Sequence, residues 1–268
     1  FFPDMDPVDL GYKALAVNLS DLAAMGAEPR WVSLALTLPA INERWVAGFA
    51  EGFLELAEYY NVALVGGDMT RGPLSITVSV KGSVPAGRAL MRSGAKAGDG
   101  VYVTGTLGDA ALALSHLLGK RTLNENQLAA VLPRLDHPHP RILAGQALRG
   151  LASSALDLSD GLASDLGHIL KASGVRAQID LNLLPLSPVL QDAVPAMDAW
   201  QLALAGGDDY ELCFTVPQEH HGALDTALAN CGVKFTRIGR ILAGEPGIDY
   251  LQDEQPVELH LKGWDHFA

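Results

Sequence analysis

The stretch that decides the fold runs from Asp6 to Gly26 and reads DPVDLGYKALAVNLSDLAAMG. Asp6 can cap the free amides of a helix, Pro7 suits the first helical position, and Asp9 places an acid in the first turn. These signals predict a helix from about Pro7 to Met25 that ends at Gly26. The strands and helices expected on either side of this helix indicate the fold class.

Strands and helices alternate outward from this helix. A β-forming run at 30–38 stops at a proline, a helix opens after Asn42, a short buried strand at 62–65 stops at the following glycines, and a strand occupies 74–84. Beyond a connection rich in Gly and Ala, we expect strands at 101–104, 154–158, 176–181, 210–216, 235–242 and 257–261, and helices after Gly108 and at 140–149, 162–172 and 219–230.

Elements mixed in this order predict an α/β (α+β) fold, in which sheets are covered by helices. The shift in composition between 85 and 100 is typical of a connection between domains. We place the boundary near Arg88, which divides the chain into an N-terminal domain, 1–88, and a C-terminal domain, 89–268.

The composition excludes several classes of function. Lys and Arg number 19 against 31 Asp and Glu, and the formal charge of −12 repels the phosphate backbone of nucleic acid. Charged residues interrupt every apolar stretch before it reaches the length of a membrane span. We find no basic leader followed by an apolar run, so we expect a cytoplasmic protein. Cys213 and Cys231 lack metal-type spacing, and we expect both in the core.

The candidate chemical groups are aspartates beside Gly or Ser where a strand ends or a helix begins. Four such motifs occur, at 18–21 (NLSD), 66–68 (GGD), 157–161 (DLSDG) and 206–209 (GGDD). Glycine lets a phosphate approach backbone amides, and carboxylates are hard oxygen ligands that suit Mg²⁺. Because two carboxylates about 4 Å apart repel by roughly 4 kcal/mol at an effective dielectric near 20, several in one cleft need cations. The pattern indicates a site for a metal–nucleotide complex.

Two of these aspartates also have a structural interpretation, which stays open at this point. Asp160 fits the cap of the helix that follows it. Asp21 falls on the same helical stripe as Leu10, Ala14 and Val17, an apolar face that predicts burial. A carboxylate there needs a metal, a cation or a dense set of hydrogen bonds, so Asp21 is either a ligand or a satisfied structural residue.

Familiar catalytic templates do not match. Segment 82–88 has the glycine spacing of a P-loop without its Lys-Ser/Thr pair, and segment 105–108 has only half of the dinucleotide fingerprint. HExxH, GxSxG and protein-kinase catalytic motifs do not occur in the sequence. We expect His137 and His139, which lie between prolines, at the surface.

The ordered set of motifs resembles thiamine-monophosphate kinases. The resemblance covers essentially the whole chain and rests on the segments 4–31, 66–72, 92–95, 157–161, 206–212 and 262–267. It implies the two-domain fold of the aminoimidazole-ribotide synthetase superfamily, in which the N-terminal domain pairs with its twin in a homodimer and ATP binds near the domain interface. It also implies transfer of the γ-phosphate of ATP to thiamine monophosphate with several Mg²⁺ ions.

Carried over by position, the resemblance implies a role for each site residue. The expected Mg²⁺ ligands, which act in catalysis together with Arg92, are Asp21, Asp68, Asp157 and Asp160. The expected ATP contacts are Gly67, Asp68, Arg92 and Ser159. The expected contacts to thiamine monophosphate are Asp208 and Trp264, at positions where the family often carries Glu and Tyr.

Two other interpretations stay open beside this one. The first is another ATP-using synthetase of the superfamily, of the aminoimidazole-ribotide or selenophosphate type, although the latter uses an early reactive Cys and no Cys precedes Cys213. The second is a nucleotide-binding regulatory module without catalysis. Family members also carry upstream Gly-Asp-Asp and Ser/Thr-Thr-Asp motifs and a histidine that these 268 residues lack, so we expect a preceding segment with further metal ligands.

Overall fold

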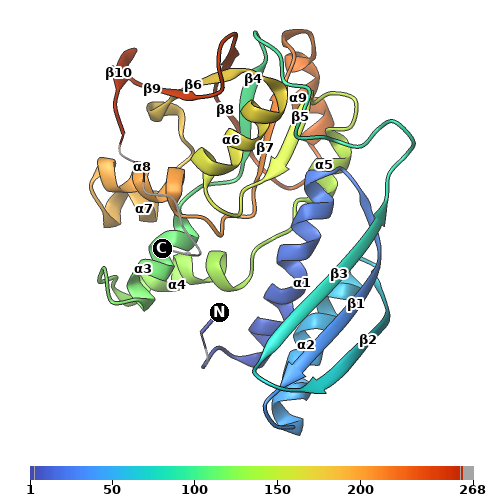
Figure 1. The fold of residues 1–268 in the computed structure, drawn as a ribbon. Coiled ribbons are helices and arrows are strands. Elements are labelled where there is room, and N and C mark those ends of the chain that lie inside the picture. The colour runs from blue at the N-terminus through green and yellow to red at the C-terminus, as the bar shows by residue number, and fades with distance from the viewer. Residues whose placement is uncertain (3, 260, 262–268) are drawn as a thin grey trace.

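The computed structural model describes residues 1–2, 4–259 and 261, and in it helix α1 (Pro7–Ala24) contacts both β-sheets of the molecule (Figure 1). Asp6 caps this helix by accepting a hydrogen bond of 2.8 Å from the amide of Val8. The chain leaves it through Gly26, whose φ of 65° is the left-handed conformation that glycine favours. The predicted helix is confirmed.

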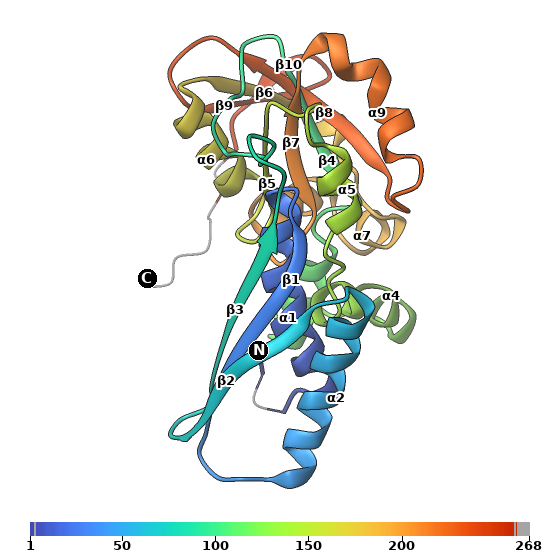
Figure 2. The same ribbon diagram turned by 90° about the vertical axis from the view of Figure 1, so that its right-hand side faces the viewer.

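The N-terminal part is a three-stranded sheet covered on one face by two helices. Its strands are β1 (Glu28–Leu38), β2 (Ala63–Arg71) and β3 (Ser75–Ser83), in the order β2-β1-β3. Strand β2 runs parallel to β1, and β3 runs antiparallel to it. Helices α1 and α2 (Glu43–Tyr59) lie against one face, while the other face stays open (Figure 2).

Helices α1 and α2 pack closely because glycine lies at their crossing. A Cβ atom on Gly11 would lie 2.1 Å from the carbonyl oxygen of Phe49, and one on Gly52 would lie 1.9 Å from that of Val8. Real side chains do not fit at these distances. The two glycines therefore set the spacing of the helix pair that supports the sheet.

Strand β2 differs from its prediction. A short buried strand was expected at 62–65, but β2 continues through Gly66-Gly67-Asp68 to Arg71 and is exposed along its whole length. The strand lies at the edge of the sheet, and its pairing with β1 persists to the last residue pair, Leu38 with Arg71. Pairing with β1 thus overrides the local glycine signal. Strand β2 lies at the exposed edge of the sheet instead of in its buried interior.

The C-terminal part contains a seven-stranded sheet among the described residues, with the order β10-β9-β6-β8-β4-β7-β5. Its strands are β4 (Gly100–Thr104), β5 (Ser154–Asp157), β6 (Arg176–Asp180), β7 (Leu212–Val216), β8 (Phe235–Leu242), β9 (Ile248–Gln252) and β10 (Gln255–Val257). Its helices are α3 (Asp109–Leu117), α4 (Glu125–Asp136), α5 (Ile142–Ala147), α6 (Leu162–Ser173), α7 (Pro188–Ala193), α8 (Ala196–Ala205) and α9 (His221–Leu228).

Several of these elements were not predicted. Helices α4, α7 and α8 and strand β9 had no counterpart. Of the described positions in the strand expected at 257–261, only Val257 is in a strand, β10, and position 260 lies outside the described residues. Proline explains part of this result, since Pro133 lies inside α4, where proline is ordinarily a signal that ends a helix. Helix α7, which Pro188 opens, has only six residues and is too short for its apolar spacing to identify it.

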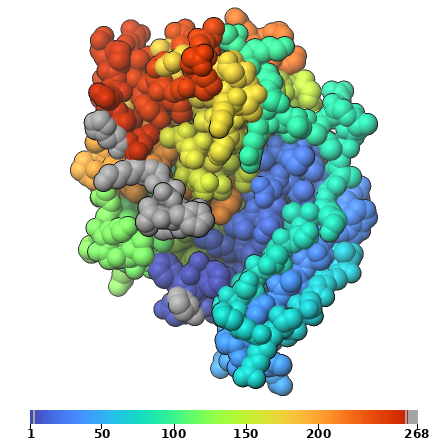
Figure 3. All heavy atoms as spheres, viewed as in Figure 1, coloured from blue at the N-terminus to red at the C-terminus, as the bar shows by residue number. Residues whose placement is uncertain are grey.

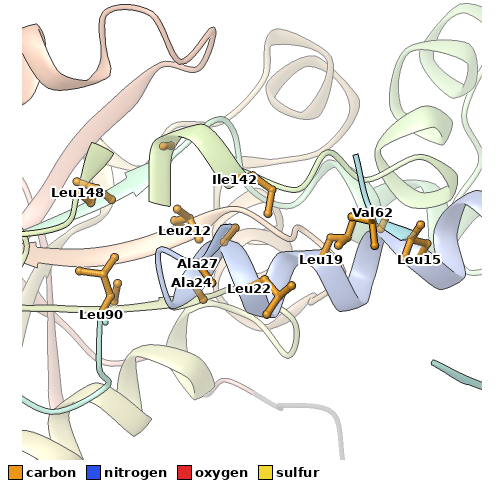
Figure 4. Packing of buried hydrophobic residues seen from close by; sticks show 14 of the residues in the cluster. Leu15, Leu19, Leu22, Ala24, Ala27, Val62, Leu90, Ile142, Leu148 and Leu212 are labelled. Atoms are coloured by element: carbon orange, nitrogen blue, oxygen red, sulfur yellow. The ribbon is translucent and has the colours of Figure 1, made fainter. Parts of the chain in front are cut away.

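A shared hydrophobic core joins the two parts of the chain. Figure 4 shows Leu15, Leu19 and Leu22 of α1 in the cluster that also holds Ile142 of α5 and Leu212 of β7. A second buried cluster packs α6 and α8 against the opposite face of the larger sheet. In the space-filling view the N-terminal part, blue to cyan, lies along the C-terminal part (Figure 3). Helix α1 is therefore fixed beside strands β5 and β7.

Within the described residues, no helix combines the length and the apolar character that a bilayer crossing demands.

Candidate active site

Three of the expected site residues meet at one cavity. Asp21 from the last turn of α1, Arg92 from the connection between the sheets, and Asp157 from the end of β5 line a cavity of about 220 Å³. Its remaining walls are largely apolar side chains from the same three segments. The shared core places α1 beside β5, and this packing brings the two carboxylates and the guanidinium together.

Asp157 is the most buried member of this group, with 9% of its surface exposed. The hydroxyl of Ser20 donates a hydrogen bond of 2.6 Å to its Oδ2. Burial, together with the charge of Asp21, raises the pKa of Asp157 to about 6, while Ser20 and Arg92 act in the opposite direction. A carboxylate held this way near neutral pH is stabilised by any cation that enters the cavity.

Asp21 does not lie where its helical stripe predicted. The buried face of α1 is formed by leucines such as Leu15 and Leu19, and Asp21 is exposed. The expected burial was wrong because the neighbours of α1 cover the arc through Leu15, Leu19 and Leu22, which leaves Asp21 at its edge. Partial desolvation still raises the pKa of Asp21, and Arg92 lowers it. Asp21 is thus free to act as a ligand.

The loop after β5 is held from within the next helix. Asp160 does not cap α6, because the N-cap position is Gly161 and no side-chain cap is present there. Instead, the buried Asp165 accepts hydrogen bonds from the amides of Ser159, at 2.9 Å, and Asp160, at 3.0 Å. Burial raises the pKa of Asp165 to about 7. Asp160 itself is exposed, so its side chain is available to a ligand.

A second loop, 206–211, is hydrogen-bonded to the first. The amide of Asp208 donates to the carbonyl of Ser159 at 2.9 Å, and the amide of Tyr210 donates to the carbonyl of Leu158 at 2.8 Å. Asp208 and Tyr210 have φ values of 60° and 49°, left-handed conformations that cost about 1–3 kcal/mol each outside glycine. Such strain persists only where the surrounding structure enforces it, as these bonds do.

Asp208 lies at the edge of this loop and faces the N-terminal helix. Its Oδ2 is 3.7 Å from the Nζ of Lys13 on α1, and both side chains are only partly exposed. Burial and the neighbouring Asp208 raise the pKa of Tyr210. The position of Asp208 therefore accepts a cationic group.

The far end of the loop is anchored by a fully buried acid. Glu211 accepts hydrogen bonds from Thr104 at 2.6 Å, from Arg134 at 2.7 Å, and from Nε and Nη2 of Arg141 at 2.7 and 2.5 Å. Burial alone would raise the pKa of Glu211, but the hydrogen bonds and charge of Arg141, with the charge of Arg134, lower it. The adjacent Asp209, also buried, accepts from the amide of Gly108 at 2.9 Å.

His137 is not a plain surface residue. Its Nε2 lies 2.7 Å from Oδ1 of Asp9, and its ring stacks on Tyr12 at a centroid distance of 4.5 Å. Since both partners belong to α1, His137 ties the loop after α4 to the N-terminal helix. His137 is thus a contact between the two parts of the chain, whereas His139 is exposed, as expected.

The remaining expected residues lie apart from the cavity. Gly67 and Asp68 lie on the exposed strand β2, where Oδ1 of Asp68 accepts from the amide of Met69 at 2.9 Å. Neither residue lines the cavity that holds Asp21 and Asp157. Trp264 lies outside the described residues. Among the residues that are described, no three His, Cys, Asp or Glu side chains converge in a metal-binding arrangement.

Comparison with known proteins defines the class first. The sequence pattern described as "AIR synthase related protein, N-terminal domain" matches residues 1–84, and the corresponding C-terminal domain matches residues 96–250. Fold and site thus define a two-domain α/β protein of the AIR synthase-related class.

Individual relatives narrow this class. The thiamine-monophosphate kinase of Escherichia coli K12 is 56% identical over 269 residues, which cover 100% of this chain and 83% of the relative. The crystal structure of the kinase from Stenotrophomonas maltophilia K279a matches with a TM-score of 0.89 and 44% identity, covering 96% of this chain and 82% of that one. A structure described as "AaThiL complexed with AMPPCP and TMP" matches with a TM-score of 0.85 and 33% identity, covering 100% and 83%. The chain belongs to the thiamine-monophosphate kinase family.

Proposed function

We propose that this protein transfers the γ-phosphate of ATP directly to the phosphate of thiamine monophosphate and so forms thiamine diphosphate. The observation that carries the proposal is the cavity where Asp21, Arg92 and Asp157 meet, beside the loop that bears Asp208. A relative of the same fold is described in complex with AMPPCP and TMP, which supports the same pair of substrates here. We place the reaction in the cytoplasm, where ATP is made and used.

Charge neutralisation is the main task of such a site. A phosphate monoester has a second pKa of about 6, so the attacking oxygen is already ionised at neutral pH and needs no strong general base. The obstacle is repulsion between the acceptor phosphate and the triphosphate. Arg92 places a permanent positive charge at the cavity, and positioning of the two phosphates for in-line attack supplies the rest of the catalysis.

The donor set of the site fits Mg²⁺. It consists of carboxylate oxygens, which this ion prefers, and burial raises the pKa of both Asp21 and Asp157, so a divalent cation would stabilise their ionised forms. The residues that would hold the ions are Asp21 and Asp157 at the cavity and Asp160 on the loop after β5, while Asp68, which lies on β2 outside the cavity, is proposed only from its place in the family's motif. When bound, Mg²⁺ would neutralise charge on the phosphate oxygens.

The substrates would occupy neighbouring subsites. The proposed ATP contacts are Gly67, Asp68, Arg92 and Ser159. The proposed thiamine monophosphate contacts are Asp208 and Trp264. The ion pair of Asp208 with Lys13 supports the acceptor subsite, because the thiazolium ring of the substrate is also a cation.

We further propose that two copies of the chain associate through the N-terminal sheet, along its open face and its exposed edge strand β2. Large apolar side chains are exposed on its strands, among them Trp31, with 49% of its surface exposed, Leu64 with 45%, Val65 with 61% and Met69 with 51%. A cluster of this kind is unusual on a monomer and favours a partner. Residues 1–88 would then form the nucleotide-binding and dimerisation domain, and 89–268 the second domain.

The proposal is tested with full-length protein, ATP, Mg²⁺ and a panel of phosphorylated acceptors. We expect thiamine diphosphate from thiamine monophosphate and no product from aminoimidazole-ribotide precursors or from selenide. Product from one of those other substrates would assign the protein to a synthetase of the same superfamily. Nucleotide binding without any product would assign a regulatory module.

A further inference from the structure

Asp165 holds the loop 158–161, which we call the donor loop, through a single oxygen atom. Its Oδ2 accepts both the amide of Ser159, at 2.9 Å, and the amide of Asp160, at 3.0 Å. Only 4% of Asp165 is exposed, and its own amide bonds the carbonyl of Gly161 at 3.0 Å. The carboxylate therefore reaches back from inside α6 to the two residues that would contact ATP and metal.

This geometry differs from ordinary helix capping. A cap residue precedes its helix and accepts the amides of the first helical turn. Asp165 does the reverse, because it lies within the helix and accepts amides that precede it. What it fixes is the direction of the two peptide planes that flank Ser159, the second of which also leads into Asp160.

The donor loop is hydrogen-bonded in turn to the loop 206–211, which we call the acceptor loop. The amides of Asp208 and Tyr210 donate to the carbonyls of Ser159 and Leu158 at 2.9 and 2.8 Å, and the amide of Leu158 donates to the carbonyl of Glu211 at 2.8 Å. The contact leaves no room for adjustment, since a Cβ on residue 207, a glycine, would lie 2.6 Å from the carbonyl oxygen of Ser159. A rotation of the Ser159 peptide must move Asp208 as well.

We propose that Asp165 is a positioning residue that holds the donor loop, 158–161, and the acceptor loop, 206–211, as one rigid unit, so that its loss impairs the handling of both substrates. The inference rests on the proposed function, because that function assigns Ser159 and Asp160 to the nucleotide and Asp208 to the acceptor. Asp165 touches no substrate in this account and acts only through the two loops.

Two substitutions separate this role from a general structural one. Asp165→Ala removes the shared oxygen and leaves two amides without a partner, so we expect kcat to fall by about 100-fold, as a displacement near 1 Å produces, and the KM for thiamine monophosphate to rise. Asp165→Asn keeps an oxygen that can accept both amides, and we expect kcat and KM within about threefold of wild type.

Asp99 provides the matched control. It is equally buried, at 4% exposure, and accepts a backbone amide, that of Lys96 at 3.0 Å, and the hydroxyl of Ser153 at 2.5 Å. Ser153 precedes β5, so this carboxylate lies at the opposite end of the strand from Asp157. We expect Asp99→Ala to lower the unfolding temperature while kcat and KM of the folded protein change less than about twofold.

The experiment is run on full-length protein with steady-state kinetics, thermal unfolding, and calorimetric binding of AMPPCP with Mg²⁺. We expect AMPPCP affinity to fall in Asp165→Ala and to be retained in Asp165→Asn, a readout that does not depend on turnover. If wild-type protein binds AMPPCP but forms no thiamine diphosphate, the proposed function fails while the binding arm still tests Asp165. Wild-type kinetics and AMPPCP affinity in Asp165→Ala, or equal impairment in both variants, would overturn the proposal.

Discussion

Replacement of Asp157 by Asn is expected to stabilise the metal-free protein and to abolish turnover at the same time. Burial and the charge of Asp21 raise the pKa of Asp157 from 3.8 to about 6. At neutral pH the folded protein therefore holds an ionised carboxylate in a place that disfavours it, whereas the unfolded chain exposes it to water. Asparagine has nearly the same shape, carries no charge, and offers an oxygen to the hydroxyl of Ser20.

The size of the effect follows from the shift. A difference of about 2 pH units at about 1.4 kcal/mol per unit gives about 3 kcal/mol in favour of Asp157→Asn above pH 6. Because the pKa of this acid is raised on folding, the penalty is absent below about pH 4, where the carboxylate is protonated in both states. It grows as pH rises from about 4 to about 6 and is constant above that. With about 2–4 °C per kcal/mol, the variant should unfold about 6–12 °C above wild type at neutral pH.

The assay is thermal unfolding in EDTA at neutral pH and near pH 4, repeated with Mg²⁺ and AMPPCP. Asp68→Asn is the matched control, since the same chemical change on the exposed strand β2 should alter stability by less than about 0.5 kcal/mol. Turnover should fall by orders of magnitude in both variants. An Asp157→Asn protein that unfolds before wild type at neutral pH, or a difference that persists unchanged at pH 4, would refute the argument that burial sets this pKa.

Four further changes test other parts of the account. Gly207→Ala should lower the free energy of unfolding by more than about 1 kcal/mol in urea titration, because its φ of 69° and the 2.6 Å approach to the Ser159 carbonyl exclude a side chain; wild-type stability would contradict this. Glu211→Gln should cost about 3–5 kcal/mol in the same titration, since two arginines lose a buried counter-ion; a cost below 1 kcal/mol would show that solvent reaches them. Val65→Glu should convert a dimer to a monomer in light scattering, and an unchanged mass would move the interface elsewhere. Trp264→Ala should raise KM for thiamine monophosphate far more than for ATP, by an amount equivalent to about 0.5–2 kcal/mol; equal changes would remove this residue from the acceptor subsite.

Local signals were sufficient wherever one segment determines its own structure. The cap at Asp6, the proline after it and Gly26 together gave the bounds of α1. Local signals failed where a distant segment determines the structure. The edge strand β2 continues through two glycines because β1 pairs with it, and Asp21 is exposed because the neighbours of α1 cover the arc through Leu15 and Leu19 instead of the predicted stripe. Sequence periodicity describes a helix face but not how many neighbours that face has.

The site could be predicted as a set of motifs but not as an arrangement. The resemblance supplied Asp21, Arg92 and Asp157, which the structure brings to one cavity, and also Asp68, which it places elsewhere. The supporting acids were missed, although Glu211 carried a usable signal. An acid followed directly by the apolar run of β7 predicts a buried, paired charge. Asp165 gave no such signal, because an acid near a helix start is common.

Transfer of the labelled γ-phosphate of ATP tests the proposed reaction directly. Full-length protein is incubated with [γ-³²P]ATP, Mg²⁺ and thiamine monophosphate, and the products are separated and degraded to locate the label. We expect all transferred label to lie in the terminal phosphate of thiamine diphosphate, its amount to equal the ADP formed, and no label to stay on the protein. Release of the label as inorganic phosphate without thiamine diphosphate, as a synthetase or an idle ATPase would give, would contradict this expectation.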